Sequence, residues 1–140
     1  MVDWKGKKIL IVDDCKLAGK AMFEASESIG LKVADVVYSA SDALKYLKNH
    51  QVDFVSLDII MPEMDGIECS RQIISNFPNI LTFFVSALSS EQRVVDVYAD
   101  EETGLGFLEK PIDTVQLEKF LNLRCAHLAQ APEIPPPPAT

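Results

Sequence analysis

Four hydrophobic runs of this chain each end in polar residues that suit phosphoryl chemistry. The pair Asp13-Asp14 follows KILIV, Asp58 follows FVSL, Ser86 follows ILTFFV and Lys110 follows GFLE. If each run is a parallel strand, these groups all lie at the carboxyl edge of one sheet, where open α/β sheets bind ligands. Three carboxylates, a hydroxyl and an ammonium in one place suit a divalent cation that faces a phosphoryl group.

A carboxylate that attacks phosphorus must overcome the repulsion between two anions. A divalent cation, a fixed ammonium and a hydroxyl donor each reduce that repulsion. Magnesium takes oxygen ligands and keeps several waters, which fits Asp13, Asp14 and Asp58 together with a backbone carbonyl beside Asp58. Mn²⁺ is the second candidate ion because it accepts the same ligands. Lys110 would supply the positive charge and Ser86 the hydroxyl.

Each of these residues also has an ordinary structural explanation. Asp14 could cap the helix that follows it, Asp58 could begin a turn, and Lys110 could simply end a strand. Taken one at a time, these explanations are favoured, and Ser86 alone carries almost no information. All of the residues at the ends of four strands, in the right order, are much harder to attribute to chance.

The hydrophobic runs alternate with amphipathic stretches along the chain. Strands are predicted at Lys8–Val12, Val33–Tyr38, Asp53–Leu57, Ile80–Val85 and Gly106–Glu109. Signals for helix ends follow the same alternation, at Gly30, Ser39, Ser89–Gln92 and Asp113. Five strand–helix units in strict alternation predict a parallel sheet with right-handed crossovers and helices on both faces. The expected fold is therefore an α/β, (βα)5 three-layer sandwich.

Length and composition agree with one such domain. The chain has 140 residues, of which 48% are hydrophobic and 24% charged, enough for one core and too few residues for two ordinary domains. We assign residues 1–6 to an N-terminal lead and 7–129 to the domain. Residues 130–140 include APEIPPPPAT, which indicates a proline-rich tail or a truncated linker.

Charge and cysteine usage indicate where the protein works. The formal net charge of −8 argues against nonspecific nucleic-acid binding by this segment. The start MVDWKGKK has no apolar leader core, and no run approaches the length of a membrane span. Cys15, Cys69 and Cys125 are odd in number and widely spaced, which fits buried or half-buried thiols in a reducing cytosol. We expect a cytoplasmic protein that contacts neither nucleic acid nor membrane.

The segments around the polar strand ends resemble the receiver domains of bacterial two-component response regulators, which are CheY-like. The matching segments are ILIVDD (Ile9–Asp14), DIIMPEMDG (Asp58–Gly66), VSA (Val85–Ala87) and GFLEKP (Gly106–Pro111). The resemblance covers roughly residues 7–129, and the string DxxMPxMDG is its most specific part. It implies a flavodoxin-like fold with strand order 2-1-3-4-5. It also implies phosphorylation of Asp58 by a sensor histidine kinase or a phosphotransfer protein.

The resemblance implies a role for each metal-site residue. Asp14 and Asp58 would bind Mg²⁺ directly and Asp13 would help through water. The backbone carbonyl of Ile60 would complete the site. Ile60 also departs from the pattern of fast-hydrolysing family members, as does Leu88, because both are aliphatic where polar groups orient the attacking water. We therefore predict slow self-dephosphorylation.

The same resemblance implies a conformational switch. Ser86 would turn toward the phosphoryl oxygens that Lys110 also binds, and Phe107 would follow it inward. This movement would alter the surface made by the fourth helix, fifth strand and fifth helix. Phe107 has no hydroxyl, so it would respond only by packing, and it could equally be a plain core aromatic. The expected partners of the switched surface are a downstream protein, a fused output domain or a second copy in a phosphorylation-dependent homodimer.

Two other functions start from the same residues. A haloacid-dehalogenase-type phosphatase also uses an Asp nucleophile, Mg²⁺ and a Lys on a parallel sheet. Such enzymes have a D-x-D motif after the first strand and a cap domain, whereas this chain has D-D and little room for a cap. A phosphorylation-independent binding module is the third candidate, against which the complete polar set argues. We predict a phosphoacceptor module that is no enzyme beyond its own Mg²⁺-dependent phosphorylation and slow hydrolysis.

Overall fold

The computed structural model describes residues 4–59, 61, 64, 66–86 and 106–130, with side chains up to Cys125. The helix expected to begin at Ser89 and the tail at 131–140 lie outside the described residues. None of the described helices is long and apolar enough to cross a membrane.

Five parallel strands form one sheet. They are β1 (Lys8–Val12), β2 (Lys32–Val37), β3 (Phe54–Leu57), β4 (Leu81–Ser86) and β5 (Gly106–Glu109). Their order is β2-β1-β3-β4-β5, which confirms the order that the sequence implied. The bounds of β1 and β5 also agree with the prediction. β4 extends one residue further than expected, so Ser86 is its last residue and not the first residue after it.

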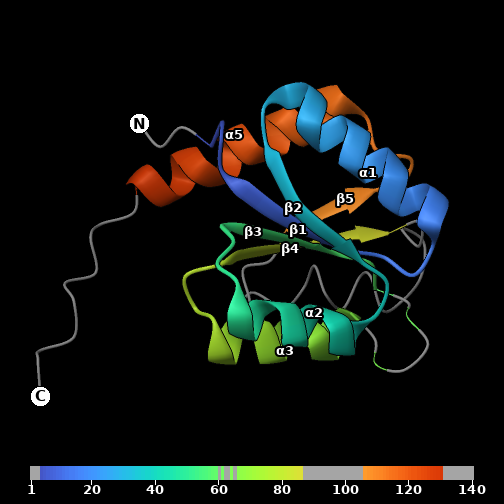
Figure 1. Cartoon of the computed structure of the whole chain (residues 1–140). Coiled ribbons are helices and arrows are strands. Elements are labelled where there is room, and N and C mark those ends of the chain that lie inside the picture. The colour runs from blue at the N-terminus through green and yellow to red at the C-terminus, as the bar shows by residue number, and fades with distance from the viewer. Residues whose placement is uncertain (1–3, 60, 62–63, 65, 87–105, 131–140) are drawn as a thin grey trace, which may run out of the picture.

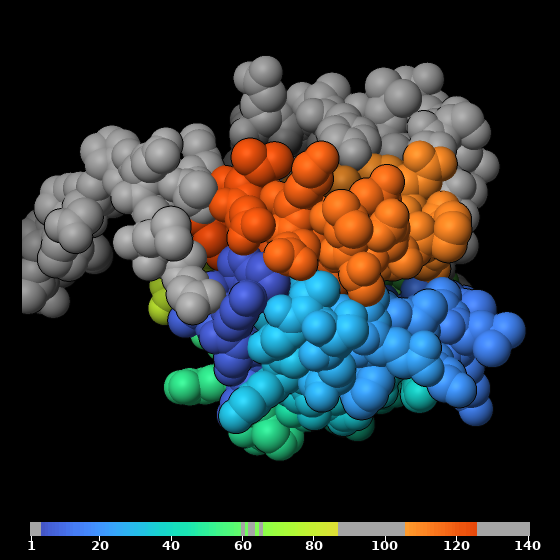
Figure 2. All heavy atoms as spheres, turned by 90° about the horizontal axis from the view of Figure 1, so that it is seen from above, coloured from blue at the N-terminus to red at the C-terminus, as the bar shows by residue number. Residues whose placement is uncertain are grey.

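The described helices cover both faces of the sheet. They are α1 (Lys16–Ile29), α2 (Ala40–Asn49), α3 (Gly66–Asn76) and α5 (Thr114–Gln130). Figure 1 shows α1 and α5 above the sheet and α2 and α3 below it. Seen from above, α1 and α5 lie side by side (Figure 2). The three-layer sandwich is therefore confirmed.

Alternating side chains of the central strands divide the core into two halves. The half that packs against α1 and α5 takes Ile9, Ile11, Phe54, Phe83, Val85 and Leu108 from the sheet. The half that packs against α2 and α3 takes Leu10, Val12, Val55, Leu57 and Phe84. Successive residues of a strand point to opposite faces, so a strand buried on both faces is largely apolar. This is why β1 appears in the sequence as an apolar run after Lys8, and why β4 is apolar apart from Thr82 and the terminal Ser86.

Local signals place the helix ends as the sequence predicted. α1 ends at Gly30, whose φ of 107° is left-handed and suits glycine. The hydroxyl of Ser39 accepts a hydrogen bond from the Asp42 amide (3.1 Å) at the start of α2. The carboxylate of Asp113 accepts one from the Val115 amide (2.8 Å) at the start of α5.

Three residues differ from what their position in the sequence suggested. Trp4 lies in the assigned lead, yet it is buried in the core between α1 and α5, and its Nε1 donates to Asn122 Oδ1 (2.7 Å). Leu17 follows the helical spacing of α1 but is 81% exposed, because the stripe that faces the sheet passes through Gly19, Met22 and Ala25. Cys15 is exposed, since the chain leaves the sheet there, while Cys69 and Cys125 are buried as expected.

Candidate functional site

The sheet ladder continues one residue beyond three of its strands, and this places the polar residues. The Asp13 amide donates to the Val37 carbonyl (3.0 Å) and the Asp58 amide to the Val12 carbonyl (2.9 Å). The Lys110 amide donates to the carbonyl of Ser86, the last residue of β4 (2.9 Å). The backbones at Asp13, Asp58 and Lys110 are therefore held by the rigid sheet rather than by free loops.

Three carboxylates converge at this edge. One oxygen from each of Asp13, Asp14 and Asp58 lies within 4.8 Å of the others. Asp13 and Asp58 are only 4% and 8% exposed, whereas Asp14 is exposed, so the cluster opens to solvent on the Asp14 side. Oxygen ligands in such a group, with room for water on one side, fit a magnesium ion.

The two carboxylates of the strand ends share one ammonium group. Lys110 Nζ lies 2.6 Å from Asp13 Oδ2 and 3.6 Å from Asp58 Oδ2. Burial by itself lowers the pKa of Lys110, but the hydrogen bond to Asp13 and the charges of Asp58 and Asp13 outweigh it. The pKa of Lys110 is thus raised above its ordinary value, and the side chain stays charged.

The surroundings of the Asp58 carboxyl group raise its pKa, because burial and the neighbouring carboxylates outweigh the effect of Lys110. Burial raises its pKa most, the ammonium of Lys110 lowers it, and the neighbouring Asp13 and Asp14 raise it further. The net result is a pKa of about 6 for Asp58 in the metal-free protein. One ammonium therefore does not compensate three carboxylates, and a divalent cation at this place would remove the imbalance.

The two adjacent aspartates have different neighbours. Asp13 Oδ1 accepts a hydrogen bond from the Cys15 amide (2.9 Å), so this carboxylate stabilises the turn into α1 while its other oxygen meets Lys110. The residue that caps α1 is Cys15, and its side chain makes no cap hydrogen bond. Asp14 thus does not occupy the capping position that could have explained it, and its carboxylate faces the cluster instead.

Gly66, the first residue of α3, lies against the backbone of Asp58 and Ile59. Its amide donates to the Ile59 carbonyl (2.6 Å). A Cβ on this residue would lie 2.8 Å from the Ile59 Cα and closer still to the Asp58 carbonyl oxygen. Only glycine allows this approach of two backbones. In the sequence Gly66 ends the string DIIMPEMDG, but its dependence on close packing could not be recognised there.

The remaining predicted residues are placed only in part. Ser86 is buried at the end of β4, between the ends of β3 and β5. Phe107 is half-buried on β5, paired in register with Phe84, and packs against the core half of α2 and α3. The peptide bond between Lys110 and Pro111 is cis. Ile60 and Leu88 lie outside the described residues.

Comparison with known proteins identifies the family. Residues 9–122 match the family model of the response regulator receiver domain. The chain belongs to this family. It is 29% identical over 117 residues to the chemotaxis protein CheY of Thermotoga maritima, which covers 84% of this chain and 96% of that protein. It is 32% identical over 130 residues to a protein-glutamate methylesterase/protein-glutamine glutaminase of Halalkalibacterium halodurans, covering 91% of this chain but 37% of that protein.

Solved structures of receivers have the same fold. The CheX–CheY–BeF3–Mg²⁺ complex from Borrelia burgdorferi contains a chain with 32% identity and a TM-score of 0.73, covering 86% of this chain and 90% of that one. A receiver domain from Methanospirillum hungatei has 21% identity and a TM-score of 0.75, covering 89% of this chain and 98% of that one, and supports the fold alone.

Family membership decides between the functions considered for the sequence. The chain is a receiver domain of CheY-like two-component response regulators, a phosphoacceptor signalling module. Receiver domains are not themselves catalytic enzymes, and the chain spans about a third of the methylesterase relatives that it matches. Receivers bind Mg²⁺ in an acidic pocket, and the cluster of Asp13, Asp14 and Asp58 fits that description.

Proposed function

We propose that this receiver accepts a phosphoryl group on Asp58, with Mg²⁺ held by Asp13, Asp14 and Asp58, and that Ser86 and Lys110 bind the phosphoryl oxygens. The observation that supports this most is the cluster of three carboxylate oxygens within 4.8 Å, with Lys110 Nζ against two of them. Membership of the receiver family gives the reaction class. The distances among these residues support the role that we propose for each.

The metal assignment follows from the donors. When bound, Mg²⁺ would supply positive charge that lowers the repulsion between the Asp58 carboxylate and the incoming phosphoryl group. The cluster provides carboxylate oxygens on a rigid edge, and the exposed side of Asp14 leaves room for water ligands. The backbone carbonyl of Ile60 is the further ligand that we propose, and Mn²⁺ is the alternative ion.

The transfer is a displacement at phosphorus. An oxygen of Asp58 forms the new P–O bond while the P–N bond of a partner phosphohistidine breaks, and the departing imidazole takes up a proton. The reacting oxygen must be ionised, so the pKa of about 6 means that protonation of Asp58 competes with transfer in the metal-free protein. Lys110 would neutralise charge on a phosphoryl oxygen.

The response to phosphorylation would pass through the ends of β4 and β5. Ser86 ends β4, and its carbonyl accepts the Lys110 amide, so a hydroxyl and an ammonium for the same group are tied to neighbouring strands. We infer that Ser86 turns toward the new phosphoryl group and that Phe107 repacks after it. The surface of β5 and α5, together with the segment between β4 and β5, is then the one that changes.

The phosphorylated state should be long-lived. Ile60 and Leu88 would flank the path of the attacking water, and neither has a polar group that could orient it. We expect the phosphoryl group on the isolated, Mg²⁺-loaded protein to be lost slowly, and substitution of Leu88 by Glu to accelerate that loss. Rapid loss of label from the wild-type protein would contradict this proposal.

The partners follow from this chemistry. The phosphodonor would be a sensor histidine kinase or a phosphotransfer protein in the cytoplasm. The output partner would be a downstream protein, a fused output domain or a second copy of this chain. The net charge of −8 makes direct nucleic-acid binding by this segment unfavourable.

The deciding experiment compares two aspartates at opposite ends of the same strand. Wild type, Asp58→Ala and Asp53→Ala are incubated with Mg²⁺ and a small acyl phosphate donor, and intact mass is measured. We expect one phosphoryl group on wild type and on Asp53→Ala, and none on Asp58→Ala. Size exclusion of the same samples reports dimerisation. Equal labelling of all three proteins, or labelling that persists in EDTA, would contradict the assignment of Asp58 and of the metal.

A further inference from the structure

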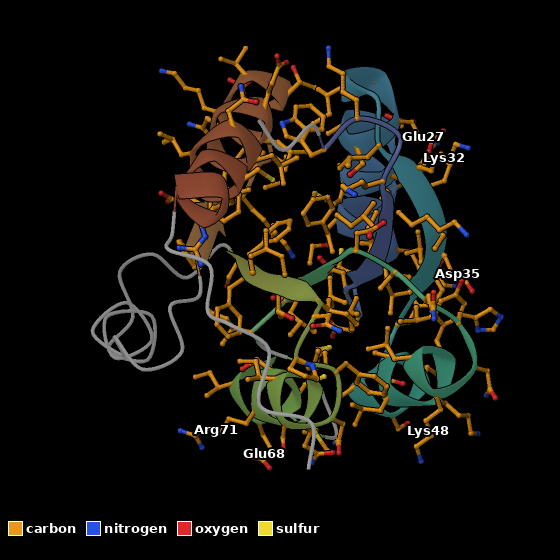
Figure 3. The ribbon with its side chains drawn as sticks, turned by 90° about the vertical axis from the view of Figure 1, so that its left-hand side faces the viewer. Glu27, Lys32, Asp35, Lys48, Glu68 and Arg71 are labelled. Carbon is orange, nitrogen blue, oxygen red and sulfur yellow. The ribbon has the colours of Figure 1, made fainter. Side chains whose placement is uncertain are left out.

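A groove lies at the amino edge of the sheet, opposite the phosphoacceptor cluster. It is formed by the start of β1 (6–8), the turn between α2 and β3 (47–53) and the turn between α3 and β4 (76–80). Its volume is about 930 Å³, comparable to that of protein ligand sites. Figure 3 looks onto this edge, and Lys48 extends outward from the end of α2. Three segments far apart in the sequence thus enclose one hollow.

The groove carries positive charge on a strongly negative protein. Lys7, Lys8 and Lys48 line it, whereas Asp53 is the one acidic residue among its described lining residues. The carboxylate of Asp53 accepts a hydrogen bond from the Lys8 amide (2.9 Å), which satisfies part of its capacity. Within the described part of the chain, none of the three ammonium groups is engaged in an ion pair. The net charge of the whole chain is −8, so this edge differs in sign from the rest.

The shape of the groove suits an extended occupant. Leu47, Val52, Phe77 and Ile80 give it an apolar floor beneath the polar rim. A second hollow of about 400 Å³ lies between α2 and α3 and shares Lys48, Asn76 and Phe77 with the first. The two hollows are therefore neighbours, the first at the sheet edge and the second on the helical layer.

The rim is also ordered where it borders α2. The ring of His50 stacks on Tyr46, with 4.0 Å between centroids and 12° between planes, and its Nδ1 lies 3.1 Å from the Tyr46 carbonyl oxygen. One face and one nitrogen of His50 are occupied by these contacts, so the ring has a defined position beside the lysines. An occupant would meet a largely formed surface, which reduces the entropic cost of binding.

We propose that this groove binds an acidic, extended segment of a partner protein. The lysines would attract its carboxylates, the side-chain amides of Asn76 and Asn79 would contact its backbone, and the apolar floor would take intervening aliphatic side chains. The opposite edge, with three clustered carboxylates, would repel the same segment and so orient the approach. The chain would then have a docking site that does not use the phosphoacceptor residues.

Charge decides among the other occupants. A nucleic acid would also be attracted to the lysines, but it would meet the repulsion of the whole chain, whereas a short acidic peptide meets only its local surroundings. The tail at 131–140 contains a single acidic residue, Glu133. The lysines therefore match an acidic partner segment better than they match the tail.

The test is a titration of the ¹⁵N-labelled full chain with a ten-residue poly-glutamate peptide at low ionic strength, followed by backbone amide shifts. We expect the shifts to cluster at 47–53 and 76–80 and to fade as salt is added, because exposed charges are screened. The groove variant is Lys8→Gln/Lys48→Gln. The matched control is Lys20→Gln/Lys119→Gln, which removes the same charge from exposed positions on α1 and α5.

The proposal predicts a different result for each protein. The groove variant should lose about tenfold in affinity and the control variant about twofold or less. Asp58→Ala should bind the peptide like wild type, so failure of docking and failure of the phosphoacceptor assignment are distinguishable. Equal losses in both lysine variants, shifts centred elsewhere, or no shifts would overturn the proposal.

Two further arms exclude the rival occupants. A short DNA duplex that binds the groove more tightly than the peptide would overturn the proposal in favour of nucleic acid. A chain that ends at Gln130 should give the same groove shifts as the full chain before peptide is added. Changes at 47–53 and 76–80 on this truncation would show instead that the tail occupies the groove.

Discussion

The two edges of the sheet differ in the sign and the burial of their charged residues, although the same strands form both edges. β1 runs from Lys8 to the residue before Asp13, and β3 runs from the residue after Asp53 to the one before Asp58. At the carboxyl edge Asp13 and Asp58 are buried and crowded, and the pKa of Asp58 is about 6. At the amino edge Lys8 and Lys48 are exposed to water.

The contrast distinguishes charged residues that serve the function of the domain from charged residues that affect its stability little. Buried like charges cost folding free energy, so their persistence at the carboxyl edge has a chemical rather than a structural reason. Exposed charges at the amino edge cost almost nothing and contribute little to stability. Substitutions at the two edges should therefore differ in size and even in sign.

The largest effect is expected from removal of the shared ammonium. Lys110→Met leaves Asp13 and Asp58 buried without their counter-charge, so the free energy of unfolding at pH 7 in EDTA should fall by about 2–3 kcal/mol. The matched change at the other edge, Lys48→Met, should alter it by about 0.5 kcal/mol or less. Urea denaturation of the three proteins measures both. Similar losses for the two lysines would remove the distinction between the edges.

The second effect concerns backbone contact beside Asp58. Gly66→Ala forces a Cβ against the Asp58 carbonyl oxygen and the Ile59 Cα, which cannot move without displacing Asp58, the proposed phosphoacceptor. We expect a loss of about 2 kcal/mol in unfolding free energy and slower phosphorylation. Gly19→Ala is the control. Its Cβ would lie a tight 3.1 Å from a methyl group of Val36, but alanine has a higher helix propensity than glycine, so the unfolding free energy should change little. Normal phosphorylation of Gly66→Ala would contradict this explanation.

The third effect has the opposite sign. The raised pKa of Asp58 favours the protonated form in the folded state, so its contribution to stability is complete below pH 4 and is lost as the pH rises through about 6. Asp58→Asn should therefore raise the free energy of unfolding at pH 7 without metal by about 1–2 kcal/mol, and leave it unchanged below pH 4. Asp53→Ala should instead lose stability, because it removes the acceptor for the Lys8 amide. Urea midpoints between pH 3.5 and 7.5 measure this.

The smallest effect is expected at the proposed docking groove. Lys8→Gln/Lys48→Gln should change the unfolding free energy by about 0.5 kcal/mol or less and leave phosphorylation of Asp58 at the wild-type rate. Thermal unfolding and intact mass after incubation with the phosphodonor check both expectations. A large loss of stability would mean that these lysines have a structural role at the amino edge.

Most of the strands, the helix caps and the position of the candidate site could be predicted from the sequence, because they depend on local patterns. Short segments with an apolar centre, KILIV and GFLE, indicated β1 and β5 with their observed bounds, and short polar signals indicated the caps at Ser39 and Asp113. The strand-end position of Asp13, Asp58 and Lys110 then led to one pocket, because parallel strands share a carboxyl edge. Periodicity alone could not show that Leu17 lies outside the buried stripe of α1.

The sequence by itself therefore indicated that Asp13, Asp58 and Lys110 lie at the carboxyl edge and, through its resemblance to receiver domains, indicated the family and the strand order. Only the tertiary structure decided that Lys110 lies closer to Asp13 than to Asp58, that Trp4 completes the core against α5, and that Gly66 touches the backbone of Asp58 and Ile59. It alone also assembled the amino-edge groove. The physical reason is the sequence separation of the interacting residues. Strand and cap signals extend over a few residues, whereas these contacts join segments that meet only when the helices pack on the sheet.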